Sequence, residues 1–132
     1  MLQKITLKSK HRSEVIEITN EVQEAVIKSG IKDGVVVVYT PHTTAGVMLF
    51  ENQDPNLHRD ILGKMGEIAP SNAKYAHVGT NADAHIKSAI TGASLMVIIE
   101  NAQIITGKWQ GLFFVDYDGP REREVLLKFL KQ

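Results

Sequence analysis

The stretch GVVVVYTPHTTAGVMLFE (residues 34–51) places two apolar runs on either side of a short polar segment. The first run, residues 34–40, is rich in β-branched valine and predicts a strand that is buried on both faces. The second run, residues 46–51, predicts another strand after a break at Pro41. The polar segment between them carries one histidine and two threonines. A loop held between two rigid strands is a common position for a functional site.

The residues before this stretch first alternate and then change period. Alternation at residues 4–8 predicts a first strand, and residues 15–18 predict a second, short one. Residues 20–29 have helical spacing, with Thr19 as the expected N-cap and Gly30 as the stop. The expected inward face of this helix consists of Val22, Ala25, Val26 and Ser29.

Asp54 and Pro55 mark the start of a second helix, because Asp is a good N-cap and Pro suits the first helical position. We expect this helix to end near Gly66 and to be followed by a loop over residues 67–80. Its expected inward residues are Leu57, Ile61, Leu62 and Met65.

Asn81 is the expected cap of a third helix, which runs to about Thr91 with Ile86 and Ile90 facing the core. Strand-like runs follow at residues 94–99, 103–106, 111–117 and 124–130. The last run alternates weakly and is compatible with a helix. Seven or eight strands with three helices between them predict an α+β fold, mainly an antiparallel β-sheet or sandwich. With no repeat or linker, residues 1–132 are expected to form a single domain.

The composition excludes several classes of function. The chain has 15 Lys+Arg and 15 Asp+Glu, and zero formal charge argues against non-specific binding to nucleic acid. No apolar run approaches the roughly 18 residues of a membrane span, and residues 1–4 do not resemble a signal peptide. The lack of cysteine excludes disulfides, thiolate nucleophiles and Cys-based metal sites, and it fits a reducing compartment such as the cytoplasm.

Three of the five histidines, one from each of three segments, are candidates for a metal site. His42 lies in the polar segment, His77 in the loop over residues 67–80 and His85 near the start of the third helix. Three such ligands would leave a position open for water or substrate. The alternative is that the threonines near His42 bond to nearby backbone and that the other two imidazoles are solvated. His11 and His58 are expected to be solvated.

Other side chains are candidates for acid–base chemistry or phosphate binding. Glu51, at a strand end, could act as a general base or magnesium ligand. Asp83 and Asn81 lie at a helix N-terminus, where free N–H groups and the dipole favour an anion, although Asp83 could be only a helix-start charge. Arg121 could hold a phosphate by two hydrogen bonds. Trp109, beside Gln110, is either a substrate platform or a core or interface anchor.

Together these motifs resemble the YjbQ-like family over nearly the whole chain. The resemblance rests on residues 41–45, Glu51 with Asp54-Pro55, Tyr75 with His77, residues 81–85, Gly107 with Trp109-Gln110, and residues 118–121. The sequence departs from the family pattern at Ala102, where glycine is usual, at Lys108, where threonine is usual, and near Ile99, where proline is common.

The resemblance implies an α+β fold that assembles as a homotrimer, with a weak thiamine-phosphate synthase activity. That reaction joins a pyrimidine pyrophosphate to a thiazole phosphate and releases pyrophosphate, normally with magnesium. Metal-assisted hydrolysis and a non-catalytic trimeric module that binds a metal or anion are the alternatives. The expected ligands of a divalent ion (zinc, magnesium or manganese) are His42, His77 and His85. The expected catalytic residues are Glu51, Asp83 and Arg121. The expected substrate or phosphate contacts are Thr43, Thr44, Asn81, Trp109, Gln110 and Arg121.

Overall fold

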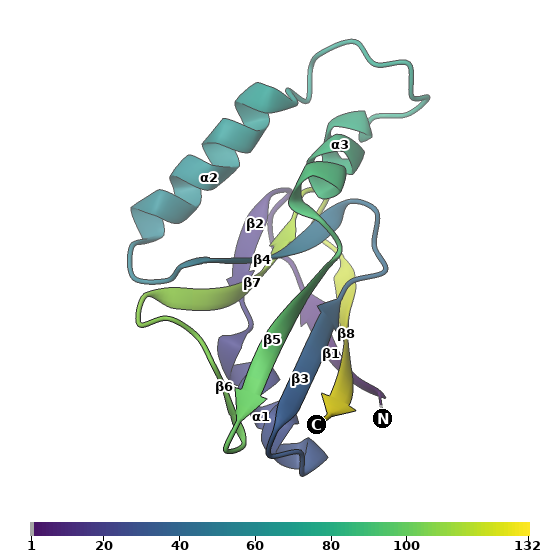
Figure 1. The fold of residues 1–132 in the computed structure, drawn as a ribbon. Helices are drawn as coiled ribbons and strands as arrows, with labels where there is room; N and C mark the ends of the chain where they lie inside the picture. Colours follow the sequence, from purple (N-terminus) through teal and green to yellow (C-terminus); the bar gives the residue numbers. More distant parts are fainter. Residues whose placement is uncertain (1) are drawn as a thin grey trace.

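The computed structural model describes residues 2–132, which form a single α+β domain with eight strands and three helices (Figure 1). The strands are β1 (Leu2–Lys8), β2 (Glu14–Glu17), β3 (Gly34–Tyr39), β4 (Ala45–Glu51), β5 (Ser94–Glu100), β6 (Gln103–Ile104), β7 (Gln110–Asp116) and β8 (Glu122–Lys131). The helices are α1 (Thr19–Ser29), α2 (Pro55–Ile68) and α3 (Ala82–Thr91). The predicted fold class is confirmed, and the last run is a strand rather than a helix.

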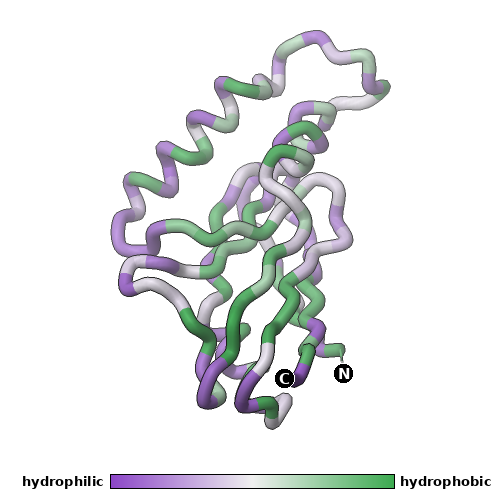
Figure 2. Tube along the Cα trace, viewed as in Figure 1, coloured by the Kyte–Doolittle hydropathy of each residue, from purple (hydrophilic) through white to green (hydrophobic). Residues whose placement is uncertain are grey.

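The strands form two antiparallel sheets. One has five strands in the order β1-β8-β3-β5-β6, and the other has three in the order β2-β7-β4. The main core contains Val36 and Val38 of β3, Phe114 of β7, Leu127 of β8 and Val22 of α1. Met65 of α2 and Ala84 of α3 instead pack on Val115 and Tyr117 in a second cluster. In Figure 2 hydrophobic residues follow β3 and β5 almost without interruption.

The pairing of β4 with β7 fixes where the candidate site residues lie. It runs from Ala45 opposite Asp116 to Glu51 opposite Gln110. At about 3.3 Å per residue, the two ends of β4 are roughly 20 Å apart. The polar segment before Ala45 and the acidic residue Glu51 therefore lie at opposite ends of one strand.

The helix boundaries confirm part of the predicted capping. Asp54 Oδ1 accepts a hydrogen bond of 2.9 Å from the Asn56 N–H, and Gly30 ends α1 with φ of +76°. Thr19 is not the N-cap, because α1 begins after Ile18 and the Thr19 hydroxyl donates to Glu17. Helix α2 continues past Gly66 to Ile68.

Three predicted burial patterns are wrong for the single chain. Ile86 and Ile90 of α3 face outward with 39% and 54% exposure, because the helix buries polar residues instead. Strand β3 is fully buried on one face only, since Tyr39 is 43% exposed. Likewise, Met65 is the only fully buried residue of α2.

Within residues 2–132, no helix combines the length and the apolar character needed to cross a bilayer.

Candidate functional site

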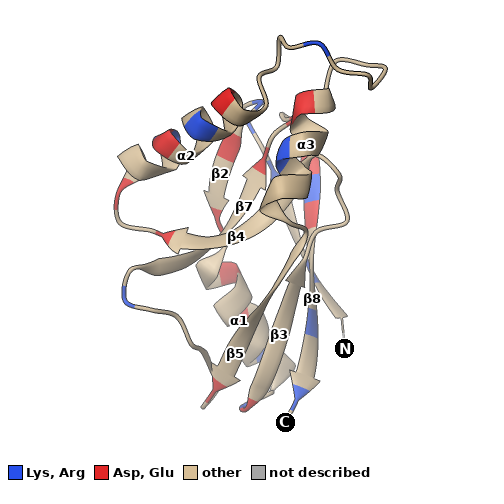
Figure 3. Cartoon of the chain, turned by 45° about the horizontal axis from the view of Figure 1, so that its top comes forward, with Lys and Arg blue, Asp and Glu red and all other residues tan. Residues whose placement is uncertain are grey.

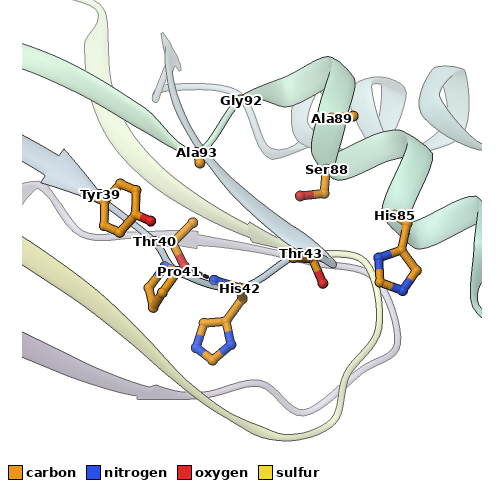
Figure 4. Close-up of a pocket in the computed structure, with 10 residues that line it drawn as sticks. All are labelled: Tyr39, Thr40, Pro41, His42, Thr43, His85, Ser88, Ala89, Gly92 and Ala93. Carbon is orange, nitrogen blue, oxygen red and sulfur yellow. Dashed lines mark hydrogen bonds between the residues drawn. The ribbon is translucent and has the colours of Figure 1, made fainter.

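A pocket of about 460 Å³ lies between the turn that follows β3 and helix α3 (Figure 4). Its wall is partly apolar and partly built from hydroxyl and imidazole groups. The lining residues are Tyr39, Thr40, Pro41, His42, Thr43, His85, Ser88, Ala89, Gly92 and Ala93. The polar segment over residues 40–43 therefore lies against the third predicted helix. The two elements together form one pocket.

The turn is held against β8 by side-chain hydrogen bonds. Strand β3 stops pairing with β8 at Tyr39, opposite Leu126. Beyond that point Thr40 Oγ1 donates to the Glu124 carbonyl at 3.1 Å, and the Glu124 N–H donates to His42 Nε2 at 2.9 Å. The two side chains thus continue the hydrogen bonding that the departing strand no longer supplies.

The same bond fixes the chemistry of His42. Burial lowers the pKa of His42, and the nearby charge of Arg123 lowers it further, so the imidazole is neutral near pH 7. Because Nε2 accepts a hydrogen bond, the proton resides on Nδ1. His42 can then donate to an anion, but neither ring nitrogen has a free lone pair for a metal ion.

His77 and His85 lie side by side, with ring centroids 5.0 Å apart in an edge-to-face arrangement. His85 comes from the first turns of α3 and lines the pocket, while His77 comes from the preceding loop and is exposed. The predicted set of three histidines is not assembled, because His42 is bonded to β8. Among residues 2–132, no group of three or more His, Cys, Asp or Glu is placed to hold a metal ion.

Asp83 is buried and fully paired, so it is not a free base. Arg12 donates to both of its carboxylate oxygens at 3.1 Å, and Lys87 Nζ donates at 3.0 Å. Burial alone would raise the pKa of Asp83, but the bonds from Arg12 and Lys87 outweigh it and lower the pKa to about 2. The carboxylate instead anchors the start of α3, and with it His85.

Asn81 and Arg121 converge on Asp118. Asn81 Nδ2 donates to the Asp118 carboxylate at 3.0 Å and makes no side-chain cap to α3. Arg121 donates to the same carboxylate at 3.1 Å and to the Asp118 carbonyl at 2.8 Å. Neither side chain lines the pocket, so the structure does not join these two predicted phosphate contacts to the histidines.

Thr44, another predicted phosphate contact, is buried beneath the turn. Its hydroxyl accepts a hydrogen bond of 2.7 Å from Arg123, which also donates to Asp116 at 2.6 and 3.0 Å. Burial opposes ionisation of Asp116, but the bonds from Arg123 keep its pKa below the usual value. The ion pair was not predicted. A signal was present, because Arg123 shares the inward period of Val125 and Leu127 along β8.

Glu51, Trp109 and Gln110 line a second pocket of about 330 Å³ at the far end of β4. The roughly 20 Å between the ends of that strand separates them from His42. His58 lies nearby, where its Nε2 donates to the Glu51 carbonyl at 2.8 Å and its ring packs edge-on against Phe50. The prediction that His58 is solvated is therefore wrong.

The chain is similar to a set of proteins that are themselves named as uncharacterised. Residues 3–132 match the family model described as UPF0047 protein YjbQ-like. UPF0047 protein MJ1081 of Methanocaldococcus jannaschii is 42% identical, over 98% of this chain and 94% of that protein. UPF0047 protein YugU of Bacillus subtilis is 40% identical, over 98% of this chain and 99% of that protein.

The fold is likewise shared with solved structures. The crystal structure of a YjbQ/UPF0047 family protein from Clostridium acetobutylicum has a TM-score of 0.94 and 44% identity, covering 97% of this chain and 99% of that one. A protein of unknown function from Sulfolobus solfataricus has a TM-score of 0.96 and 30% identity, covering 100% and 97%. The chain belongs to the YjbQ-like UPF0047 family.

Proposed function

We propose that the pocket between the 40–43 turn and α3 is the active site of a cytoplasmic enzyme that acts on small phosphorylated substrates. The observation that carries the proposal is the position of His85, which lines the pocket and also lies against His77. Helix α3 therefore places one member of the histidine pair, His85, in the wall of a cavity. That cavity has hydrogen-bond donors on one side. Sites of this kind, with a mainly apolar wall and a few converging polar groups, are typical of small-molecule binding.

The donors suit a phosphate group. His42 offers an N–H on Nδ1 from a neutral ring, and Thr43 offers a hydroxyl. Tyr39 and the two alanines of the wall, Ala89 and Ala93, give an apolar surface on which the organic part of a substrate can lie. Donors that are fixed before the substrate arrives stabilise developing negative charge without rearrangement.

The histidine pair also supplies candidate ligands for a divalent metal ion. His77 and His85 offer two imidazoles, a donor set that suits zinc or manganese better than magnesium, which prefers oxygen ligands. An ion bound there would neutralise the charge on a phosphate or a leaving pyrophosphate. His42 would contribute a hydrogen bond to the substrate and not a metal bond.

The first reaction to test is thiamine-phosphate synthesis, in which a pyrimidine is transferred from its pyrophosphate to a thiazole phosphate. In this proposal His42 and Thr43 hold phosphate oxygens and the apolar wall shields the reacting carbon from water. No covalent nucleophile is required. Metal-assisted hydrolysis of a phosphoester is distinguished by phosphate release in the absence of any acceptor.

Removal of metal is expected to abolish turnover. Protein treated with a chelator should lose pyrophosphate release and product formation, and zinc or manganese should restore both better than magnesium does. The measurement is product formed per active chain, with the metal content determined on the same samples. Unchanged turnover in metal-free protein would contradict the metal-dependent part of the proposal.

We also propose that the chain associates as a homotrimer through the outer face of the five-stranded sheet. Met96 and Ile98 are 61% and 59% exposed there, beside Tyr39 and Leu130. An apolar surface of this kind on a soluble chain commonly marks an interface. The same face explains the β3 run of valines, which predicted burial on both sides.

Light scattering is expected to give a mass near three times the 14.6 kDa of one chain. Ile98→Glu places a charge in the proposed interface and should shift the mass toward one chain. Ile27→Glu, at an equally exposed position on α1, is the matched control and should leave the mass unchanged. A wild-type mass of one chain would refute the proposal.

A further inference from the structure

The turn over residues 107–110 carries Trp109 and is hydrogen-bonded to the residue that follows β4. The Gln110 N–H donates to the Gly107 carbonyl at 3.1 Å, and the Gln110 side chain accepts from the Gly107 N–H at 3.0 Å. The Asn52 N–H donates to the Trp109 carbonyl at 2.9 Å. These bonds fix the backbone of Trp109 on both sides, while the residue as a whole stays 57% exposed.

Phe50, which also lines this second pocket, is held in place by aromatic packing. Phe50 stacks on Phe113 with ring centroids 4.0 Å apart and an angle of 5° between the planes. The His58 ring packs edge-on against both rings, and its centroid lies 5.3 Å from that of Phe50 and 5.0 Å from that of Phe113. A pocket of about 330 Å³ that is lined by Phe50 and Trp109 has the size of a small organic molecule.

A side-chain cation already lies near the aromatic surface of this pocket, and a carboxylate lines the same pocket. The Lys108 ammonium lies 5.5 Å from the centroid of the Trp109 ring, within the range of a cation–π contact. Glu51 lines the same pocket, and its Oε2 accepts a hydrogen bond from the Asp54 N–H. Figure 3 shows the acidic end of β4 next to the loop that leads into β7. The chain itself therefore places a positive charge over the indole, near a carboxylate.

We propose that the pocket formed by Phe50, Glu51 and Trp109 binds a small organic cation, such as a quaternary ammonium group or an N-alkylated aromatic ring. The cation lies over the indole face, is attracted by Glu51, and replaces the Lys108 ammonium in its contact with the ring. Weakly hydrated cations of this kind lose less on leaving water than an ammonium does, so they compete well for an aromatic surface. This site is at the other end of β4 from the histidine pocket and goes beyond the proposed function.

Trp109 is the only tryptophan of the chain, so its indole N–H gives a single reporter signal in a ¹H–¹⁵N spectrum. Choline is the probe, and 3,3-dimethylbutan-1-ol is its neutral isostere. Choline is expected to shift the signal in a saturable way, whereas the isostere should bind about three- to tenfold more weakly, the range of a partly exposed cation–π contact.

Variants separate this proposal from simple apolar binding. Lys108→Met removes the competing ammonium and should tighten choline binding severalfold. Glu51→Gln, which retains an oxygen that can accept the Asp54 N–H, should weaken it severalfold. His85→Ala should leave choline binding unchanged, so a failure of this site is distinct from a failure of the histidine pocket. Equal shifts by choline and its isostere, or weaker choline binding by Lys108→Met, would overturn the proposal.

Discussion

Replacing Arg123 with methionine is expected to lower the free energy of unfolding by about 3–5 kcal/mol, the usual effect of removing one member of a buried ion pair. Arg123 and Asp116 are 2% and 0% exposed, and the guanidinium holds the carboxylate through two hydrogen bonds and Thr44 through another. The methionine fills most of the space but leaves Asp116 buried without a cation. Chemical denaturation at pH 7 measures the change.

Arg121→Met is the matched control for this prediction. Arg121 lies two residues away and also bonds an aspartate, but its side chain is 52% exposed. Surface pairs contribute about 0–1 kcal/mol, so this variant should remain close to wild type. If the two variants lose the same stability, the buried pair is not the feature that matters.

The dependence on pH gives a second signature of the Arg123 variant. In the wild type the pKa of Asp116 is below its ordinary value of about 3.9, so the carboxylate adds stability above that pH and loses it as the pH falls. Without Arg123, burial raises the pKa of Asp116 above its unfolded value. The variant then gains stability on acidification, and the gap between the two proteins narrows below neutral pH.

Replacing His85 with alanine is expected to reduce kcat/KM for the proposed phosphoryl substrate by about a hundredfold or more, as loss of a metal ligand or general acid usually does. His85 lines the pocket, and its ring also lies against that of His77. His77→Ala should cause a loss of similar size if the two rings act as a pair. The same preparations are analysed for bound zinc and manganese, which both variants should lose.

His11→Ala is the control for the histidine variants, since His11 is exposed and distant in sequence from the pocket lining. It should retain wild-type turnover and metal content. Denaturation curves show whether His85→Ala keeps its fold. A folded His85→Ala with wild-type turnover would remove the basis for placing catalysis in this pocket.

Most of the fold follows from local patterns in the sequence. The valine run at 34–40 and the alternation at 4–8 both form strands, and Asp54 begins α2 as its chemistry predicts. The family resemblance is also confirmed, because residues 3–132 match the family model. The strands and the helix start are encoded within a few neighbouring residues, and the family motifs are read in their order along the chain, so one sequence is enough for both.

The candidate site was less accessible from the sequence, because the partners of its residues are distant along the chain. Asp83 is held by Arg12, which is 71 positions away, and Thr44 by Arg123, which is 79 positions away. His42 is committed to the Glu124 backbone across 82 positions. Each of these side chains has polar groups that suit ligand binding. Only the fold shows that these groups already form hydrogen bonds within the protein.

The buried face of helix α3 differs from the predicted one for a related reason. The apolar residues Ile86 and Ile90 predict an inward face, yet the helix turns Asp83 and Lys87 toward the body of the protein. Asp83 and Lys87 are buried together with Ala84 and Ser88, and the two isoleucines lie on the exposed face of the helix. Periodicity alone cannot rank a charge network against an apolar stripe when the partner of the charge is unknown.

The inward polar face of α3 sets the precision of the histidine pocket. An apolar stripe holds a helix through contacts without direction, so such a helix can rotate slightly about its axis at little cost. Asp83 instead accepts two hydrogen bonds from the planar guanidinium of Arg12. Such a two-point contact depends on direction, so it restricts the rotation of α3 about its axis. Since His85 is two residues further along the same turn, the ion pair between Arg12 and Asp83 also helps to hold the backbone from which the His85 ring extends into the pocket.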